Sequence, residues 1–162
     1  MKIAKVERSY HRNGRLFQEV PFVGGKVNGV IREWHKNGTL AKEVPMKDGL
    51  RHGLCKEWNE KGDLLGQFEM NMGTGISRHW FPNGQLQFEI SLISESFTGR
   101  QRRWDEDANL IEETYFLQNR RVSKEEYDRA CRSDSSLPTY ENVDGRRRSS
   151  RQKNGSRNGE RL

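Results

Sequence analysis

The chain contains few of the residues from which a conventional globular core is built. Only 31% of its 162 residues are hydrophobic, whereas 32% are charged. Its two cysteines are too few for a disulfide framework, so a reducing, cytoplasmic location is expected. No apolar run is long enough for a signal peptide or a bilayer span. These shortages argue against a disulfide-rich secreted scaffold and against a helical membrane protein.

Patterns that indicate catalysis or cofactor binding are also missing. No serine, cysteine or carboxylate stands in a recognisable nucleophile context, and the glycines are not spaced as a phosphate-binding loop. Two of the four histidines, His11 and His35, lie 24 residues apart in similar local sequence. This repetition favours positions spread along a solvated surface over convergent metal ligands. We therefore expect no enzymatic activity, no cofactor and no metal site.

The end of the chain is poor in apolar residues and strongly basic. Residues 146–162 carry seven Lys or Arg and a single acidic residue, Glu160. Such a segment cannot offset its ordering entropy by burial, so we predict a disordered basic tail over 133–162. The cations expected to give a weak electrostatic contact with nucleic acid or anionic lipid are Arg146, Arg147, Arg148, Arg151 and Lys153. Tyr140 begins a short motif, Tyr-Glu-Asn-Val, that is typical of modification or sorting sites.

The feature that the chain does have is a repeat. An aromatic residue, a turn residue four positions later and a leucine two positions after that recur every 22 to 24 residues. The five copies are Tyr10/Gly14/Leu16, Trp34/Gly38/Leu40, Trp58/Gly62/Leu64, Trp80/Gly84/Leu86 and Trp104/Ala108/Leu110. A fixed period of this size is typical of proteins in which each unit packs only against its neighbours. The pattern predicts an elongated repeat domain over residues 6–122.

Each unit is predicted to form a β-hairpin with a three-residue loop. Asn37-Gly38 separates two segments rich in aromatic and β-branched residues, which is a strong hairpin signal. In the fourth unit, Pro82 precedes Asn83-Gly84, as in a type I turn followed by a left-handed glycine. This loop places each aromatic residue opposite the leucine. We therefore predict an all-β repeat fold, an elongated, twisted antiparallel meander of about five hairpins with nine or ten strands.

Counting by two along these strands predicts one apolar and one polar face. In the second unit the apolar face is expected to carry Val30, Trp34, Leu40, Val44 and Met46. The polar face is expected to carry a solvated acidic row of Glu19, Glu43, Glu89 and Glu113, with Gln67 in the third unit. A face-to-face homodimer, or a lid from the end of the chain in a monomer, would cover the apolar side.

Two further signals complete the predicted architecture. Four glycines, one in each connection between units, are expected to mark the turns that join the hairpins: Gly29, Gly53, Gly75 and Gly99. Ser123 and Glu126 form a capping box before a segment with helical spacing. This predicts a capping helix, within residues 123–132 and spanning about 124–132, that packs on the fifth unit. The fifth unit is itself atypical, with Ala108 at the glycine position.

A column of cations precedes the aromatic residues by two positions. Its members are Arg8, Arg32, Lys56, Arg78 and Arg102. Their stems can pack while their heads stack on neighbouring indoles or pair with carboxylates, and this structural interpretation is the simpler one. A ladder of cations and aromatic residues would alternatively suit an acidic protein surface or a single-stranded nucleic acid. The candidate partner-binding residues are Trp34, Trp58, Trp80, Trp104, Arg32, Lys56, Arg78 and Arg102.

The pattern W-x-x-N-G-x-L, followed by a paired-glycine turn, resembles the MORN-repeat variant found in bacterial antitoxins of the YwqK type. The resemblance covers roughly residues 6–131, and it departs from the pattern at Ala108 and at Lys61, which replaces the asparagine of the third copy. It implies a non-enzymatic protein that binds and neutralises a partner toxin. The alternative is a MORN-type scaffold tethered to anionic membrane or RNA through its basic tail. Deleting residues 146–162 would distinguish these two functions.

Overall fold

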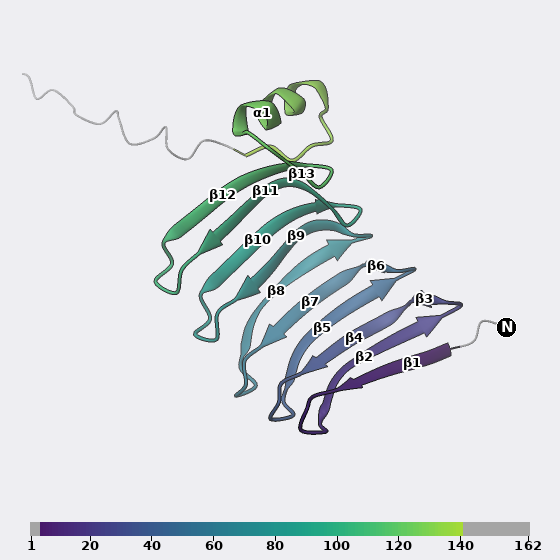
Figure 1. The fold of residues 1–162 in the computed structure, drawn as a ribbon. Helices are drawn as coiled ribbons and strands as arrows, with labels where there is room; N and C mark the ends of the chain where they lie inside the picture. The colour runs from purple at the N-terminus through teal and green to yellow at the C-terminus, as the bar shows by residue number, and fades with distance from the viewer. Residues whose placement is uncertain (1–3, 141–162) are drawn as a thin grey trace, which may run out of the picture.

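The computed structural model is an open, twisted β-sheet with a helix at its C-terminal end (Figure 1). It describes residues 4–140, and residues 1–3 and 141–162 lie outside this range. The elements are β1 (Ala4–Tyr10), β2 (Leu16–Val23), β3 (Lys26–Val27), β4 (Gly29–Trp34), β5 (Leu40–Lys47), β6 (Leu50–Arg51), β7 (Gly53–Trp58), β8 (Leu64–Asn71), β9 (Thr74–Trp80), β10 (Leu86–Ile93), β11 (Ser96–Trp104), β12 (Leu110–Leu117), β13 (Arg120–Val122) and α1 (Lys124–Ser133). In these residues, no helix is both long and apolar enough to cross a membrane.

The strands follow one another across the sheet in chain order, and each pairs antiparallel with its neighbours. Within residues 4–140 there are thirteen strands rather than nine or ten, partly because two long strands are interrupted at Asn28 and His52. The pieces before these residues, β3 and β6, pair with β2 and β5. We number the hairpins 1 to 5 as β1/β2, β4/β5, β7/β8, β9/β10 and β11/β12. The predicted all-β meander of five hairpins is confirmed.

The predicted loop register is also confirmed. Trp34 pairs with Leu40, and the four other aromatic residues pair with their leucines in the same way. In hairpin 2 the Gly38 amide donates to the His35 carbonyl, and the His35 amide donates to the Thr39 carbonyl, each over 2.9 Å. Gly38 has a φ of 94°, the left-handed conformation that favours glycine. The first part of each hairpin therefore follows directly from its turn residues.

Beyond the loop, the second strand of each hairpin gains one residue. Leu40 pairs with Trp34, but the preceding residue Glu33 pairs with Lys42, so Ala41 has no partner of its own. The other four hairpins show a register shift at the same place. Such a β-bulge moves every later side chain of that strand to the other face of the sheet. A count by two that starts at Leu40 therefore assigns the rest of β5 to the wrong face.

The predicted apolar face is accordingly wrong. Val30 pairs with Pro45, whereas Val44 pairs with Ile31 on the opposite side of the sheet. Met46 pairs with Gly29 and lies on the same side as Val44. The apolar residues of the first strands and those of the second strands thus lie on different faces. Neither face is a continuous apolar strip.

The predicted acidic row is wrong for the same reason, because the bulge places it on the face of the cationic column. We call this side of the sheet the ladder face. It carries the cross-strand pairs Arg8 with Glu19, Arg32 with Glu43, Lys56 with Gln67, Arg78 with Glu89, and Arg102 with Glu113. The acidic residues are therefore partners of the cations rather than a separate solvated row.

The apolar core lies on the other side of the sheet, across hairpins 3 and 4. Cys55 and Met70 are each 1% exposed, because side chains from neighbouring strands cover one another. The cluster consists of Cys55, Met70, Ile90 and Leu92, with Val44, Phe68 and Phe88 packed against it. Side chains of neighbouring strands thus pack together on one face of a single sheet and form a small core that excludes water.

The second set of glycines does not lie in the turns, contrary to the prediction. The connecting turns are formed by residues just before them, such as Asp48-Gly49, where both residues have positive φ. Gly29 and Gly53 lie in or next to the interrupted strands, with φ of 115° and 118°. A Cβ on Gly29 would lie 3.0 Å from the Pro21 ring on the neighbouring strand. These glycines therefore permit close packing at the interruption of each strand.

The helix forms as predicted and ends one residue later, at Ser133. The Ser123 hydroxyl accepts from the Glu126 amide at 3.1 Å, which satisfies a free donor of the first turn. Tyr127 is 1% exposed and its ring lies 5.4 Å from that of Tyr115 on β12. The helix therefore covers the ladder face at hairpin 5 only. The tail was expected to begin at residue 133, but residues 134–140 return to the sheet, and the rest of the tail lies outside the described residues.

Candidate partner-binding surface

Cation–carboxylate pairs run across most of the ladder face. The closest contacts are 2.7 Å for Arg8 with Glu19, 3.0 Å for Arg32 with Glu43, 3.4 Å for Arg78 with Glu89 and 2.6 Å for Arg102 with Glu89. Each pair joins two strands, so the guanidinium groups are already engaged within the sheet. A partner would have to break these pairs to use the same arginines, which weakens the case for an anion track along the whole column.

Glu89 is the most buried member of the ladder. Its residue is 8% exposed, and its two carboxylate oxygens contact Arg78 on β9 and Arg102 on β11. The Arg102 guanidinium also lies 4.9 Å from the ring centre of Trp104. A buried carboxylate between two cations holds hairpins 4 and 5 together. Two of the candidate binding residues, Arg102 and Trp104, thus have a structural role in this place.

Hairpin 3 breaks the ladder. Lys56 faces Gln67 on β8 and Glu43 on β5, but no ion pair of Lys56 is found within residues 4–140. Leu54, two residues earlier on the same face, is 40% exposed. An ammonium group that forms no ion pair among the described residues and an exposed leucine form a small mixed surface. Lys56 is the only member of the column, among the described residues, that forms no ion pair.

The turns are joined to one another by asparagine side chains, and this connection is also broken at hairpin 3. The Asn13 amide donates to the Lys36 carbonyl, and Asn37 donates to the Glu60 carbonyl. Asn83 makes the corresponding contact with Glu106 at 3.4 Å. Lys61 occupies this position in the third turn, and its side chain makes no such bond within residues 4–140. We call the boundary between two neighbouring hairpins a seam. The seam between hairpins 3 and 4 lacks the asparagine link that the other seams have.

The same seam has the fewest strand pairs. β8 and β9 pair only at Met70–Gly75 and Asn71–Thr74, beside their connecting turn. Further along, the indole of Trp80 occupies the space where a side chain of Gly66 would begin, and it stacks on Phe68 with ring centres 6.4 Å apart. The seam is thus filled by an aromatic ring where the neighbouring seams are closed by backbone hydrogen bonds.

A pocket opens where this seam meets the turns. Its volume is about 480 Å³, and Trp58 and Trp80 both line it. Lys61 and Pro82 contribute from the two turns. Two of the four candidate tryptophans are therefore brought together, whereas Trp34 and Trp104 belong to other hairpins. Aromatic side chains around a concave site are typical anchors of protein interfaces.

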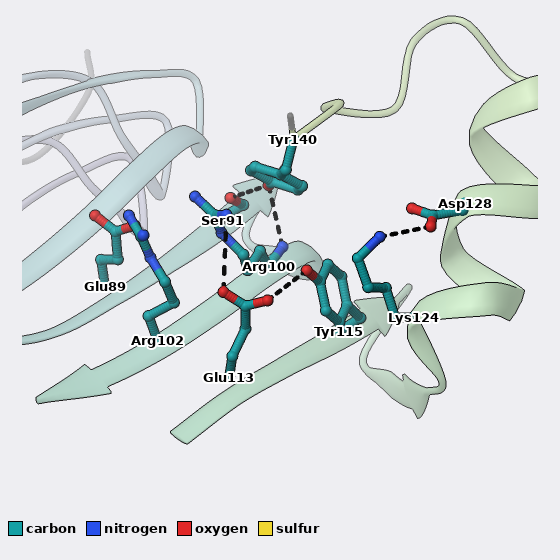
Figure 2. Close-up of polar contacts among 9 residues, drawn as sticks. All are labelled: Glu89, Ser91, Arg100, Arg102, Glu113, Tyr115, Lys124, Asp128 and Tyr140. Atoms are coloured by element: carbon teal, nitrogen blue, oxygen red, sulfur yellow. Dashed lines mark hydrogen bonds and ion pairs between the residues drawn. The ribbon is translucent and has the colours of Figure 1, made fainter. Parts of the chain in front are cut away.

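The segment after the helix closes the C-terminal end of the ladder face (Figure 2). The Tyr140 hydroxyl contacts the Ser91 hydroxyl at 2.5 Å and accepts from the Arg100 amide at 3.0 Å. The Arg100 guanidinium lies 4.3 Å from the Tyr140 ring centre. Below it, Glu113 accepts from the Tyr115 hydroxyl at 2.6 Å. A second, open pocket of about 700 Å³ lies between this segment and β9–β11.

The titratable groups of the described residues do not form a catalytic arrangement. Burial raises the pKa of the Cys55 thiol from 9.0 to about 11, which suppresses the reactive thiolate. Burial, with the nearby Glu113, also raises the pKa of Tyr115. No group of three His, Cys, Asp or Glu side chains that could hold a metal ion is found between residues 4 and 140.

Sequence reasoning missed the roles of several residues. His11 and His35 are half-buried rather than solvated, because a ring nitrogen of each donates to a tryptophan carbonyl of the next repeat, at 2.7 and 2.9 Å. The anchoring of Tyr140 had no sequence signal. The departures at Lys61 and Gln67 were visible, but the packing of the Trp80 indole against Gly66 is visible only in the structure. The basic tail residues, from Arg146 to Lys153, lie outside the described residues.

Comparison with known proteins adds one finding. Residues 27–48 and 74–93 match the model of the MORN repeat variant. These stretches cover the connections and strands of hairpins 2 and 4. No curated protein and no solved structure matches the chain. The match is to the repeat unit and indicates a repeat scaffold, generally non-enzymatic, that binds proteins or associates with membranes.

Proposed function

We propose that the chain is a non-enzymatic binding protein of the antitoxin or immunity type, which docks a partner toxin on hairpin 3 and blocks it by occlusion. We assign the docking site to hairpin 3 because departures from the repeat are concentrated in this one hairpin. Lys56, Lys61, Gly66 and Gln67 each replace a residue that performs a structural task in other repeats. Residues that depart from the sequence pattern of a fold are expected mostly at functional sites.

The chemistry of hairpin 3 indicates what the partner presents. Lys56 can bind an acidic group of a partner, because it forms no ion pair within residues 4–140 although Glu43 and Gln67 lie opposite it. Leu54, at 40% exposure, and Leu64, at 52%, offer apolar contact nearby. The Trp58–Trp80 pocket can receive one side chain of the partner. We therefore expect an acidic residue flanked by apolar residues on the toxin.

The antitoxin role is supported by the resemblance of the repeat to that of bacterial antitoxins, together with the match to the repeat variant. Neutralisation by occlusion needs a surface but no reaction, and the described residues offer surfaces rather than a catalytic site. A cytoplasmic location is consistent with this role, since a toxin made in the same cell must be bound before it acts.

Co-expression tests this proposal. A toxin encoded beside this gene should stop growth alone and should be suppressed by the wild-type protein. Lys56→Glu and Leu54→Ser should each weaken suppression and lower the measured affinity at least tenfold. Lys26→Glu, the same charge change at an exposed site outside hairpin 3, should leave both unchanged. The docking site is wrong if Lys56→Glu suppresses the toxin as well as Lys26→Glu does.

A second function is favoured by the charge of residues 146–162. A scaffold held at anionic membrane or RNA by this tail would lose its binding when residues 146–162 are deleted. Vesicles containing phosphatidylserine, neutral vesicles and a single-stranded RNA are the probes, each at low and high salt. An antitoxin would retain neutralisation after the same deletion. Retention of toxin suppression with loss of vesicle binding would assign the two activities to different parts of the chain.

A further inference from the structure

We propose that this protein associates head to tail, with β1 of one copy adding to the outer edge of β12 of the next. The two ends of the sheet are complementary halves of one repeat. Within residues 4–140, β1 pairs only with β2, and all seven of its residues are exposed. An edge strand of this kind presents free backbone donors and acceptors to another strand.

The N-terminal end supplies the second half of a repeat strand. Arg8 pairs with Glu19 as Arg32 pairs with Glu43, so β1 corresponds to β4. In hairpin 2, the short strand β3 comes directly before β4 and pairs with the end of β2. No counterpart of β3 precedes β1 within the described residues. β1 therefore corresponds to the second half of a repeat strand.

The C-terminal end of the sheet supplies the first half of a repeat strand. Phe116 and Leu117 of β12 pair with Arg121 and Arg120 of β13. The equivalent Phe22 and Val23 of β2 pair with β3 in the same way. After Val122 the chain turns into α1 instead of continuing along β12. β13 thus begins a sixth repeat, which is not continued along β12 within residues 4–140.

The vacant stretch of β12 lies next to β13, at the rim of the sheet in Figure 1. In the interior seams, Gln18 and Glu19 of β2 pair with Glu33 and Arg32 of β4. The equivalent positions on β12 are Glu112 and Glu113, which pair with β11 on one side and with no strand on the other within residues 4–140. An added strand in the repeat register would occupy that side.

The charges at the two ends match this register. A β1 strand added to β12 would place its Arg8 opposite Glu113 and its Ser9 opposite Glu112. Arg102, the neighbour of Glu113 on β11, is already bonded to Glu89 at 2.6 Å. The nearest cation to Glu113 is Arg100 at 3.8 Å. Glu113 thus retains the capacity to accept from a second arginine, as Glu89 does in the interior.

The contact uses different surfaces on the two copies, so it does not close on itself. Such heterologous contacts produce open assemblies unless the rotation per copy closes a ring. Each added copy would continue the ion-pair ladder and the twist of the sheet across the junction. Hairpin 3 lies away from both ends and would remain free to bind its partner.

Light scattering and sedimentation of the full chain over a range of concentrations test the proposal. Wild type should increase in mean mass beyond the dimer as concentration rises. Arg8→Glu and Glu113→Arg should each weaken association at least tenfold. In an equimolar mixture of the two variants, both junctions between unlike copies pair opposite charges, so alternating copies should regain open association. The double variant, with the charges exchanged, should regain open association.

Three results would overturn the proposal. One is a wild-type protein that stays monomeric at millimolar concentration. Another is a mass that saturates at the dimer and is unaffected by Arg8→Glu, as a face-to-face dimer would give. The third is a mixture of the two variants that associates no better than either variant alone. Circular dichroism of each variant, compared with wild type, separates loss of association from loss of folding.

Discussion

Gly66 lies against the indole of Trp80, whose ring fills the space that a side chain at residue 66 would need. The two residues belong to neighbouring hairpins, and the ring also stacks on Phe68 next to the apolar core. An aromatic side chain thus takes the place of the backbone ladder that closes the other seams. The absence of a Cβ at one position determines how two repeats meet.

We expect Gly66→Ala to destabilise the protein by about 1 to 3 kcal/mol, the usual cost of overpacking. The added methyl group would displace the indole, so the fluorescence of Trp80 should change as well. Urea unfolding measures the first effect and emission spectra the second. Gln67→Ala, at the next and exposed position, is the control and should change stability little. Equal stability of Gly66→Ala and wild type would contradict the packing described.

Removal of the shared carboxylate in the ladder should be costly. Glu89→Gln leaves Arg78 and Arg102 without the buried charge between them, and we expect a loss of about 1 to 3 kcal/mol. Glu43→Gln removes a carboxylate that pairs with Arg32 alone, whose side chain is 43% exposed, and should cost less than about 1 kcal/mol. Thermal unfolding of both variants gives the comparison. If the two costs are equal, burial does not govern the strength of the ladder.

Much of this architecture follows from the sequence, because the signals involved are local. Asn37-Gly38 determines the hairpin loop, and Ser123 with Glu126 determines the start of α1. The bulge at Ala41 could not be recognised, because strands such as β5 carry apolar residues at both odd and even positions. That single extra residue per hairpin changed the expected face of every acidic residue in the ladder.

The candidate site was predictable only in part. The tryptophans and the cationic column could be found by their spacing, but their partners depend on which side chains the bulge brings to the same face. Arg32 and Lys56 both have Glu43 opposite, but the second neighbour is Glu19 for Arg32 and Gln67 for Lys56. Tyr140 is positioned by tertiary contacts with Ser91 and Arg100, which are distant in the sequence.

The Tyr140 hydroxyl should hold the segment after the helix on the sheet. Tyr140→Phe removes its contacts with Ser91 and with the Arg100 amide, and we expect a loss of about 1 to 2 kcal/mol. Amide exchange around residue 140 should accelerate before the rest of the protein is affected. Tyr10→Phe, at a position 60% exposed, is the matched control. Unchanged exchange in Tyr140→Phe would show that the ring alone provides the anchor.

Stability should fall at alkaline pH because of Cys55. Burial raises the pKa of this thiol in the folded protein from 9.0 to about 11, so the folded state holds its proton more tightly than the unfolded state. The resulting stabilisation is complete below pH 9 and is lost as the pH approaches 11. It amounts to about 2 to 3 kcal/mol.

Denaturant titrations between pH 8 and pH 11 measure this dependence. Other groups, including Tyr127, also titrate in the alkaline range, so the informative quantity is the difference between wild type and Cys55→Ala. The variant should be less stable at pH 8 because of the cavity, and its stability should fall less steeply with pH. Parallel curves for the two proteins would contradict a buried, protonated thiol.

The helix α1 starts where a further strand would otherwise have continued along β12, so the point at which the chain leaves the sheet decides how many hairpins the molecule has. The backbone pairs before it all join adjacent strands, although Arg51 also contacts Glu95, two connections further along the chain. The molecule could therefore be lengthened by copying a block such as residues 26–49, whose turn keeps the asparagine that reaches its neighbour. Copying residues 50–73 instead would duplicate the glycine and lysine of the loosely paired seam. The choice of the duplicated unit would thus decide how many bonds join the added hairpin to its neighbours.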